Sequence, residues 1–511
     1  MLTFPFRSLN FSVVLAFFAF QNLFSQVVFR EVPDYEMRAS DSLFFDITST
    51  RSIISLNGKW KVSPADEEDV PKTTINVPSI FEGEGELVFE KEFELSKTLI
   101  LTNTLELIFF SINYTADISL NNTIIYRHSG GEYPFKISLP RDILKSDKKN
   151  VLSLKLSYSL NSKNSIPQKQ RFLFPKNFGG IIGDVFIHVN PDFYIVKEKI
   201  SKTFSSDYKN FSLEIETLIK NNKIRDTIAV SEEPVEYKLI SIISDQIGNI
   251  VKELPAFTFT LARNKDLSIN LKTDLSEAVL WSPENPSSYI LTQTIFVDDS
   301  LIDKQTKSLA LFDLVSSNES LKLNGNEYIL RGVAYYPGSE IYGKLIPYDK
   351  MERDISLIKE SGFNCVRFEK STIHPYFLNL CEKYGLFAFL EIPINAVPSG
   401  IASDEGFVSR SREFLQNYIS FYGDYSAFVA IGFGGTYLPG LPEHISLISL
   451  LSDAAKEKSK LLTFASFAET DLSIIDNLDL YGIEFMKSEP SDKSVQIKEL
   501  QNKIGKGRTN K

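Results

Sequence analysis

The segment Leu323–Pro393 begins Leu-Asn-Gly-Asn-Glu-Tyr-Ile-Leu-Arg-Gly-Val and ends Phe-Leu-Glu391-Ile-Pro. Between these ends, short apolar strand patterns alternate with helical patterns. The expected order is strand Tyr328–Val333, helix Asp349–Gly362, strand Phe363–Phe368, helix His374–Tyr384 and strand Leu386–Leu390. Each strand ends on a polar or charged residue, which is typical of an α/β barrel that builds its site at the carboxyl ends of its strands.

The same alternation continues towards the C-terminus. We expect, in order, helix Glu413–Tyr422, strand Phe428–Phe433, helix Glu443–Lys458 and strands Leu461–Phe467 and Leu478–Phe485. This gives six strands, whereas a closed barrel of this type has eight. After Met486 the chain becomes polar and lysine-rich. The sequence therefore predicts an incomplete TIM barrel over residues 321–486 and a polar tail over 487–511.

Two β-rich regions precede the barrel. Residues 35–191 show short alternating strands separated by turn signals such as Asn121-Asn122 and the loop His128–Phe135, a pattern typical of a jelly-roll, sugar-binding-like β-sandwich. Exposed aromatic residues on such a sandwich can stack on sugars, but we interpret Trp60 and Tyr133 as core residues. Residues 192–318 have the strand spacing of an immunoglobulin-like β-sandwich. The expected fold class is multidomain β plus α/β: an N-terminal jelly-roll β-sandwich, an immunoglobulin-like β-sandwich and a partial (β/α)8 TIM barrel.

Composition limits the classes of partner. The chain has 511 residues, a formal net charge of -10 and a hydrophobic share of 43%, which suits several packed cores and argues against nucleic acid as a partner. Its two cysteines, Cys365 and Cys381, are interpreted as buried thiols rather than a bridge. None of the four histidines has metal-ligand spacing, so no metal and no cofactor is expected.

The N-terminus resembles a targeting segment. Arg7 precedes the apolar run Phe11–Phe20, and polar residues follow up to a cleavage site near Ser25. This favours a signal peptide over residues 1–26 and a secreted, periplasmic or cell-surface protein. An ordinary N-terminal helix and a retained membrane anchor are the alternatives. No later stretch has the length of a transmembrane span.

Several motifs occur in an order that resembles glycoside hydrolase family 2, the β-galactosidase and β-glucuronidase type. They are Leu56-Asn-Gly-Lys-Trp60, Asn177-Phe-Gly-Gly-Ile181, Trp281-Ser-Pro-Glu-Asn-Pro286, Leu323-Asn-Gly325 with Arg331-Gly-Val333, and Asn364-Cys-Val-Arg367 with Glu391-Ile-Pro393. Each motif is weak alone, and their joint order carries the resemblance. It implies a β-linked glycan or oligosaccharide as the partner, a barrel without metal-dependent chemistry, and secretion.

Residues that the family uses for chemistry are replaced here. A retaining glycosidase needs two carboxylates about 5–5.5 Å apart. The resemblance places Gly434 where the family has an asparagine and Gly435 where it has the acid/base glutamate. It places the nucleophile on a seventh strand, beyond the six that the pattern predicts. Tyr336 lies where the family usually shows a histidine, and Lys370 occupies another histidine position. We therefore expect no catalytic residue at the family's positions.

Four residues remain as candidates for substrate binding: Arg367, Glu391, Tyr336 and Tyr481. Arg367 and Glu391 could also form a structural ion pair at the barrel mouth. The first hypothesis is a hydrolytically inactive family 2-like protein that still binds glycan. The second is an active β-glycosidase that uses relocated carboxylates, or one completed by a homo-oligomer or a partner chain. The third is a non-catalytic surface scaffold. The acids near strand ends that could be relocated are Glu369, Glu391, Glu469 and Glu484.

Overall fold

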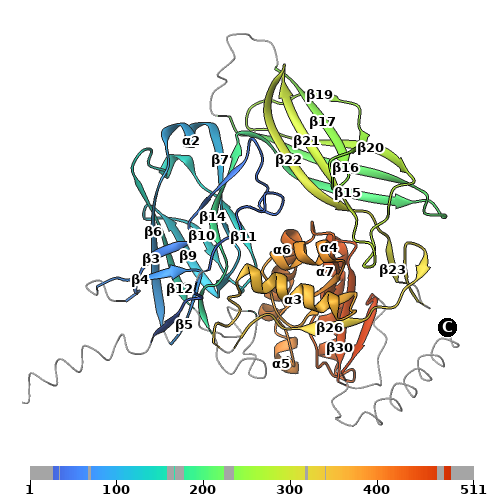
Figure 1. The fold of residues 1–511 in the computed structure, drawn as a ribbon. Coiled ribbons are helices and arrows are strands. Elements are labelled where there is room, and N and C mark those ends of the chain that lie inside the picture. The colour runs from blue at the N-terminus through green and yellow to red at the C-terminus, as the bar shows by residue number, and fades with distance from the viewer. Residues whose placement is uncertain are drawn as a thin grey trace, which may run out of the picture.

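A computed structural model describes residues 27–33, 35–66, 71–83, 85–157, 166, 178–223, 235–316, 320–339, 341–468 and 477–484. The predicted signal peptide, the polar tail, Asn177 and Glu469 lie outside these residues. Two β-sandwiches and one α/β unit make up the fold (Figure 1). The fold class predicted from the sequence is confirmed. None of the helices in the described part of the chain is long and apolar enough to cross a membrane.

The N-terminal domain is built from three antiparallel sheets. Their strand orders are β1-β5-β13-β8, β10-β9-β12-β6-β3-β4 and β11-β7-β14-β2. The strands are β1 (Val28–Arg30), β2 (Ser52–Ser55), β3 (Gly58–Pro64), β4 (Thr73–Val77), β5 (Ser79–Glu82), β6 (Glu86–Glu94), β7 (Asn103–Phe109), β8 (Ile112–Asn113), β9 (Thr115–Leu120), β10 (Thr123–His128), β11 (Phe135–Ser138), β12 (Lys149–Ser157), β13 (Gly179–Ile181) and β14 (Val185–Pro191). Trp60 is buried and its indole N–H donates to the carbonyl of Leu56 at 2.8 Å, which confirms its core role.

The second domain is a sandwich of two antiparallel sheets. One has the order β15-β16-β20, and the other has the order β18-β17-β21-β22 with β19 also paired to β17. The strands are β15 (Phe193–Phe204), β16 (Asn210–Asn221), β17 (Glu236–Ser244), β18 (Ile250–Glu253), β19 (Phe257–Thr260), β20 (Asp266–Ser276), β21 (Ser288–Val297) and β22 (Ser300–Ala310). In β20 nearly every second residue is buried, which is the alternation expected of a sheet with one face on a core.

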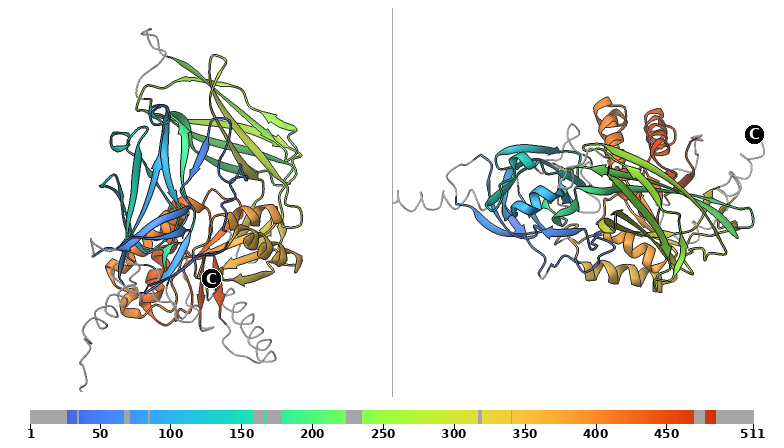
Figure 2. Two further views of the ribbon diagram at one scale, coloured as in Figure 1. Left: turned by 60° about the vertical axis from the view of Figure 1, so that its left-hand side comes forward. Right: turned by 90° about the horizontal axis from the view of Figure 1, so that it is seen from above.

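The third unit contains one parallel sheet whose strands follow chain order. Three short strands precede it, and its helices lie on the outer side of the sheet (Figure 2). The elements are β23 (Leu314–Ser316), β24 (Leu321–Leu323), β25 (Asn326–Glu327), β26 (Gly332–Tyr335), α3 (Tyr348–Glu360), β27 (Cys365–Phe368), α4 (Tyr376–Tyr384), β28 (Phe387–Glu391), α5 (Ser399–Ala402), α6 (Glu405–Tyr422), β29 (Phe428–Gly432), α7 (Pro442–Lys458), β30 (Leu462–Phe467) and β31 (Leu480–Ile483). Within the described residues, pairing stops at β26 on one side and β31 on the other, so the barrel is partial.

The first barrel strand begins later than predicted. The sequence pattern placed it at Tyr328–Val333, but β26 begins at Gly332. The Asn364 side chain holds the preceding residues outside the sheet: its amide oxygen accepts from the backbone N–H of Arg331 at 2.7 Å, and its nitrogen donates to the carbonyl of Ile329 at 2.9 Å. A backbone bond from the N–H of Asn364 to the carbonyl of Arg331 at 3.0 Å joins the two segments just before β26 begins.

The jelly-roll domain and the barrel share one continuous hydrophobic core, whereas the second domain has a separate core. At the shared boundary, the ring of Tyr133 meets the ring of Phe414 edge-on, with centroids 5.1 Å apart. Phe110 of the jelly roll similarly packs against His374 of the barrel at 4.9 Å. The jelly roll therefore fixes the positions of barrel helices and of the loops around the strand ends.

Candidate functional site

Arg367 and Glu391 meet at the carboxyl ends of the adjacent strands β27 and β28. The Nε of Arg367 donates to Oε1 of Glu391 at 2.8 Å, and its Nη2 lies 2.6 Å from the same oxygen. The backbone N–H of Lys370 donates to the other oxygen of Glu391 at 2.8 Å. The predicted structural ion pair is confirmed. Since both oxygens of Glu391 are engaged and its side chain is fully buried, it positions Arg367, whose side chain remains 29% exposed.

Electrostatics support this division of roles. Burial raises the pKa of Glu391, and the nearby guanidinium of Arg367 opposes that rise. A buried carboxyl is stable in its ionised form only with such a partner. The guanidinium also lies over the ring of Phe464, 5.9 Å from its centroid. Arg367 is therefore held from two sides and stays partly exposed.

Side chains on the two glycines after β29 would clash with their neighbours, with backbone atoms at Gly434 and with side-chain atoms at Gly435. Gly434 has a φ of 88°, and a Cβ on it would lie 1.8 Å from the carbonyl oxygen of Ile394. A Cβ on Gly435 would lie 2.2 Å from Oε1 of Glu484 and 2.4 Å from Oγ of Ser466. The space that a side chain at position 435 would enter is thus already occupied by the carboxylate of Glu484.

Glu484 is held by four groups. Its Oε1 accepts from the hydroxyl of Ser466 at 2.6 Å and from the backbone N–H of Thr436 at 2.9 Å, and its Oε2 accepts from the Thr436 hydroxyl at 3.0 Å. The Nζ of Lys370 lies 3.8 Å from Oε1. Burial alone would raise the pKa of Glu484, but these hydrogen bonds and the lysine charge outweigh burial and lower it. Glu484 is therefore an ionised acceptor.

Lys370 links this group to a second carboxylate. Its Nζ lies 2.9 Å from Oε1 of Glu369, a side chain that is 26% exposed. Ser466 connects the two halves of the site, because Nη2 of Arg367 lies 3.4 Å from its hydroxyl. The acids were predicted from the sequence, but their partners Thr436 and Ser466 were not. Thr436 follows the fourth predicted strand and Ser466 lies near the end of the fifth, and these positions were the available signal.

The two candidate tyrosines lie in different surroundings. Tyr336 follows β26 and is half-buried; burial raises the pKa of its hydroxyl, as does the carboxylate of Glu132, while a hydrogen bond with Ser371 lowers it. Tyr481 stacks on Phe467, with ring centroids 6.0 Å apart. In the pairing of β31 with β30, Gly482 is opposite Ser466 and Tyr481 is opposite Ala465, so the side chain of Tyr481 lies on the face of the sheet away from Ser466 and is not brought to the site.

The jelly roll contributes a buried carboxylate beside the site. Glu132, in the loop between β10 and β11, accepts from the hydroxyl of Thr372 at 2.9 Å and from the amide of Asn113 at 2.6 Å. It also forms an ion pair with Lys344. The sequence did not predict this contact, because it joins residues of two domains.

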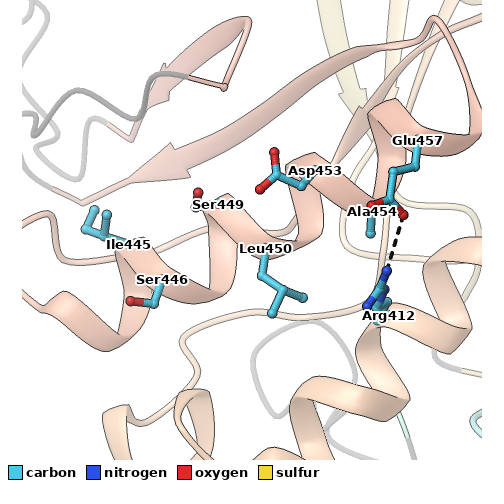
Figure 3. A pocket seen from close by; sticks show the side chains of 8 residues that line it. All are labelled: Arg412, Ile445, Ser446, Ser449, Leu450, Asp453, Ala454 and Glu457. Atoms are coloured by element: carbon cyan, nitrogen blue, oxygen red, sulfur yellow. Dashed lines mark hydrogen bonds and ion pairs between the residues drawn. The ribbon is translucent and has the colours of Figure 1, made fainter.

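A groove of about 580 Å³ lies elsewhere, between α6 and α7 on the outer side of the barrel (Figure 3). Arg412 and Glu457 form an ion pair of 3.2 Å at one end of it. The groove shares no residue with the strand-end site. In the described part of the chain, no group of three or more His, Cys, Asp or Glu side chains could hold a metal ion.

Comparison with known proteins agrees with this architecture. Residues 315–413 match the family described as glycosyl hydrolases family 2, TIM barrel domain. The chain carries a family 2 barrel domain. The fold of the chain is similar to that of a candidate β-galactosidase from Bacteroides fragilis, at a TM-score of 0.78 and 17% identity, over 89% of this chain and 70% of that one.

Two further solved family 2-like folds are similar. A Bacteroides uniformis β-glucuronidase aligns at a TM-score of 0.76 and 19% identity, over 89% of this chain and 58% of that one. A β-glucuronidase from an uncultured Clostridium aligns at a TM-score of 0.71 and 18% identity, over 86% of this chain and 77% of that one. The chain thus spans little more than half the length of the B. uniformis enzyme.

Proposed function

We propose that this chain is a family 2 protein of carbohydrate metabolism that binds a β-linked glycan at its strand-end site and does not hydrolyse it. The observation that carries the proposal is at Gly435, which has no side chain to donate a proton. Glu484 and Ser466 occupy the space that the Cβ of such a side chain would need. A general acid within reach of the leaving oxygen is required for glycoside hydrolysis.

Glycan binding is supported by two polar side chains at the site that remain partly exposed to solvent. Arg367 and Glu369 offer N–H donors and an acceptor, the combination that recognises sugar hydroxyls, and both side chains are more than a quarter exposed. The solved proteins of similar fold are described as β-galactosidase and β-glucuronidases, which makes β-linked galactosides and glucuronides the first ligands to test.

The test combines turnover with binding. Purified protein should show no release of the aryl group from aryl β-galactosides or β-glucuronides, and should bind β-linked oligosaccharides on a glycan array. Glu369→Gln should weaken that binding by roughly tenfold, the loss expected for one hydrogen bond to a charged group. Glu457→Gln, on the outer helix face, is the matched control and should bind as the wild type. Silence on the array together with stable capture of a protein would favour the scaffold hypothesis instead.

A second candidate is an active glycosidase with relocated carboxylates. The observation that favours it is that Glu369 and Glu484 lie on the same ammonium, 2.9 and 3.8 Å from Nζ of Lys370, so the two carboxylates are close together. Turnover that has a bell-shaped pH profile and is abolished by Glu484→Gln would establish this function and refute the inactive one. Activity that appears only in a homo-oligomer or after adding a second chain would indicate completion by a partner.

Export of the protein is also proposed, on the strength of Arg7 and the apolar run Phe11–Phe20. N-terminal sequencing of protein recovered from the periplasm, the cell surface or the medium should find a start near residue 26. A start at Met1 in the cytoplasm would contradict it.

A further inference from the structure

A buried charged cluster joins the jelly roll to the immunoglobulin-like domain. Arg51, just before β2, donates through Nε to Oδ1 of Asp303 at 3.0 Å and through Nη2 to Oδ2 at 2.6 Å. The same Nη2 donates to the carbonyl of Ile195 at 2.7 Å. Asp303 is fully buried on β22 and Arg51 is 3% exposed. This two-pronged pair crosses the domain boundary without access to water.

A second carboxyl in the cluster faces a neutral amide instead of a guanidinium. Glu198 of β15 is 3% exposed. With the amide of Gln305 turned so that its nitrogen faces the carboxyl group, that nitrogen donates to the two oxygens of Glu198 at 2.6 and 2.9 Å, and the amide oxygen accepts from Nη1 of Arg51 at 3.1 Å. These N–H donors favour the ionised carboxylate, but the neutral amide supplies no charge to offset the burial of Glu198.

Charged groups face Glu198 from all three domains. Asp46 and Arg51 approach from the jelly roll, Lys307 from β22, and Asp424 from the barrel residues after α6. Asp424 also lies 3.7 Å from the Nζ of Lys307 and of Lys197. His188 of β14 is buried beside Asp46, with its Nε2 3.3 Å from the backbone carbonyl of that residue. The proton affinity of Glu198 therefore depends on how the three domains are placed around it.

Burial and these charges set the proton affinity of Glu198. Burial raises its pKa from 4.5 to about 7; repulsion from Asp46 and Asp424 adds to the rise, and Lys307 and Arg51 oppose it. The folded chain thus holds a proton at Glu198 between these two pH values when the unfolded chain does not. The resulting stabilisation is complete below pH 4.5, declines as pH rises, and is absent above about pH 7.

We propose that Glu198 is a proton sensor at this junction: its protonated form favours tight docking of the jelly roll on the immunoglobulin-like domain, and its ionised form loosens that docking. The docking can be followed directly, because the backbone N–H of Lys304 on β22 donates across the boundary to the hydroxyl of Thr50 at 2.9 Å. Exchange of that amide with deuterium reports opening of the junction.

The experiment compares the full-length wild type with Glu198→Gln, which mimics the protonated form, at pH 5 and pH 8.5. After correction for intrinsic exchange, the wild type should lose protection at Lys304 between these pH values, and Glu198→Gln should not. The ratio of their protection factors at pH 8.5 should be up to about 300-fold, the value of 2.5 pKa units. At pH 5 the two proteins should differ by no more than about fourfold, because the open form of the wild type is then largely ionised at Glu198.

Two controls keep the result interpretable. Glu236→Gln, on an exposed position of β17, should follow the wild type at both pH values. Glu198→Met removes the charge without an amide and should also abolish the pH dependence, so a folding defect specific to glutamine cannot decide the outcome. Equal loss of protection at Lys304 in the wild type and in both Glu198 variants would overturn the proposal.

Discussion

The substitution Gly434→Ala tests whether the backbone after β29 can accept any residue other than glycine at this position. The residue has a φ of 88°, and a Cβ would lie 1.8 Å from the Ile394 carbonyl oxygen and 2.7 Å from its carbonyl carbon. Both are backbone atoms, so no side-chain rotation can relieve the contact, and one of the two segments has to move.

The cost has two parts. A non-glycine residue in the left-handed region loses about 1–3 kcal/mol. Forcing an extra carbon into a packed region costs about a further 1–3 kcal/mol. We therefore expect Gly434→Ala to lower the free energy of unfolding by about 2–6 kcal/mol, a large part of the roughly 5–15 kcal/mol typical of folded proteins.

Urea unfolding followed by tryptophan fluorescence measures this effect. Trp281 is suited to it, since the ring is fully buried and lies 5.1 Å from the ring of Phe387 in the barrel. Gly440→Ala is the matched control, because a Cβ there meets no atom within 4 Å, and it should change stability by less than about 0.5 kcal/mol. If Gly434→Ala unfolds at the wild-type urea concentration, the argument from steric exclusion is wrong. An Asn-Glu pair at 434 and 435 should likewise lower the free energy of unfolding, because the residue at 434 would meet the same backbone atoms.

Three further outcomes are expected. Glu391→Gln should destabilise the barrel by about 3 kcal/mol in urea, the low end for breaking a buried ion pair, because Arg367 retains contact with water; an unchanged midpoint would contradict this. Burial lowers the pKa of His128 from 6.5 to about 4, so stability present above pH 6.5 should fall by about 3 kcal/mol as pH drops through 4, and His128→Phe should abolish that loss. Cys365 and Cys381 are buried free thiols, and burial raises the pKa of Cys365 to about 12. A thiol reagent at pH 8 should therefore label neither in the native protein and both after denaturation, and fast native labelling would argue against their burial.

Periodicity alone was sufficient for the architecture. Alternation predicted the two sandwiches, and the helix–strand alternation predicted the six parallel strands, because burial of one face imposes a period on the sequence wherever a sheet or helix packs. The start of β26 was missed, since it depends on the side chain of Asn364, which lies more than thirty residues away and has no local signature.

Only part of the candidate site could be predicted from the sequence. The loss of an acid at Gly435 was readable from one residue, whereas the filling of its space required the convergence of Ser466 and Glu484 from two later strands. The face of Tyr481 could not be assigned, because a one-residue shift in register moves a side chain to the other face of a strand as short as β31. Pairing with β30 determines that register.

The distribution of cores bears on how such a chain can be divided and recombined. Since the jelly roll and the barrel bury their apolar residues against one another, an exchange that separates them would expose a large part of a common interior. The immunoglobulin-like domain has its own interior, but it also packs Trp281 and Ala310 into an apolar cluster with barrel residues such as Phe387, and it meets the jelly roll through the ion pair Arg51–Asp303. Recombination between related genes should therefore exchange the middle domain more readily than either of the other two, provided that the incoming domain supplies an aromatic ring where Trp281 packs on Phe387.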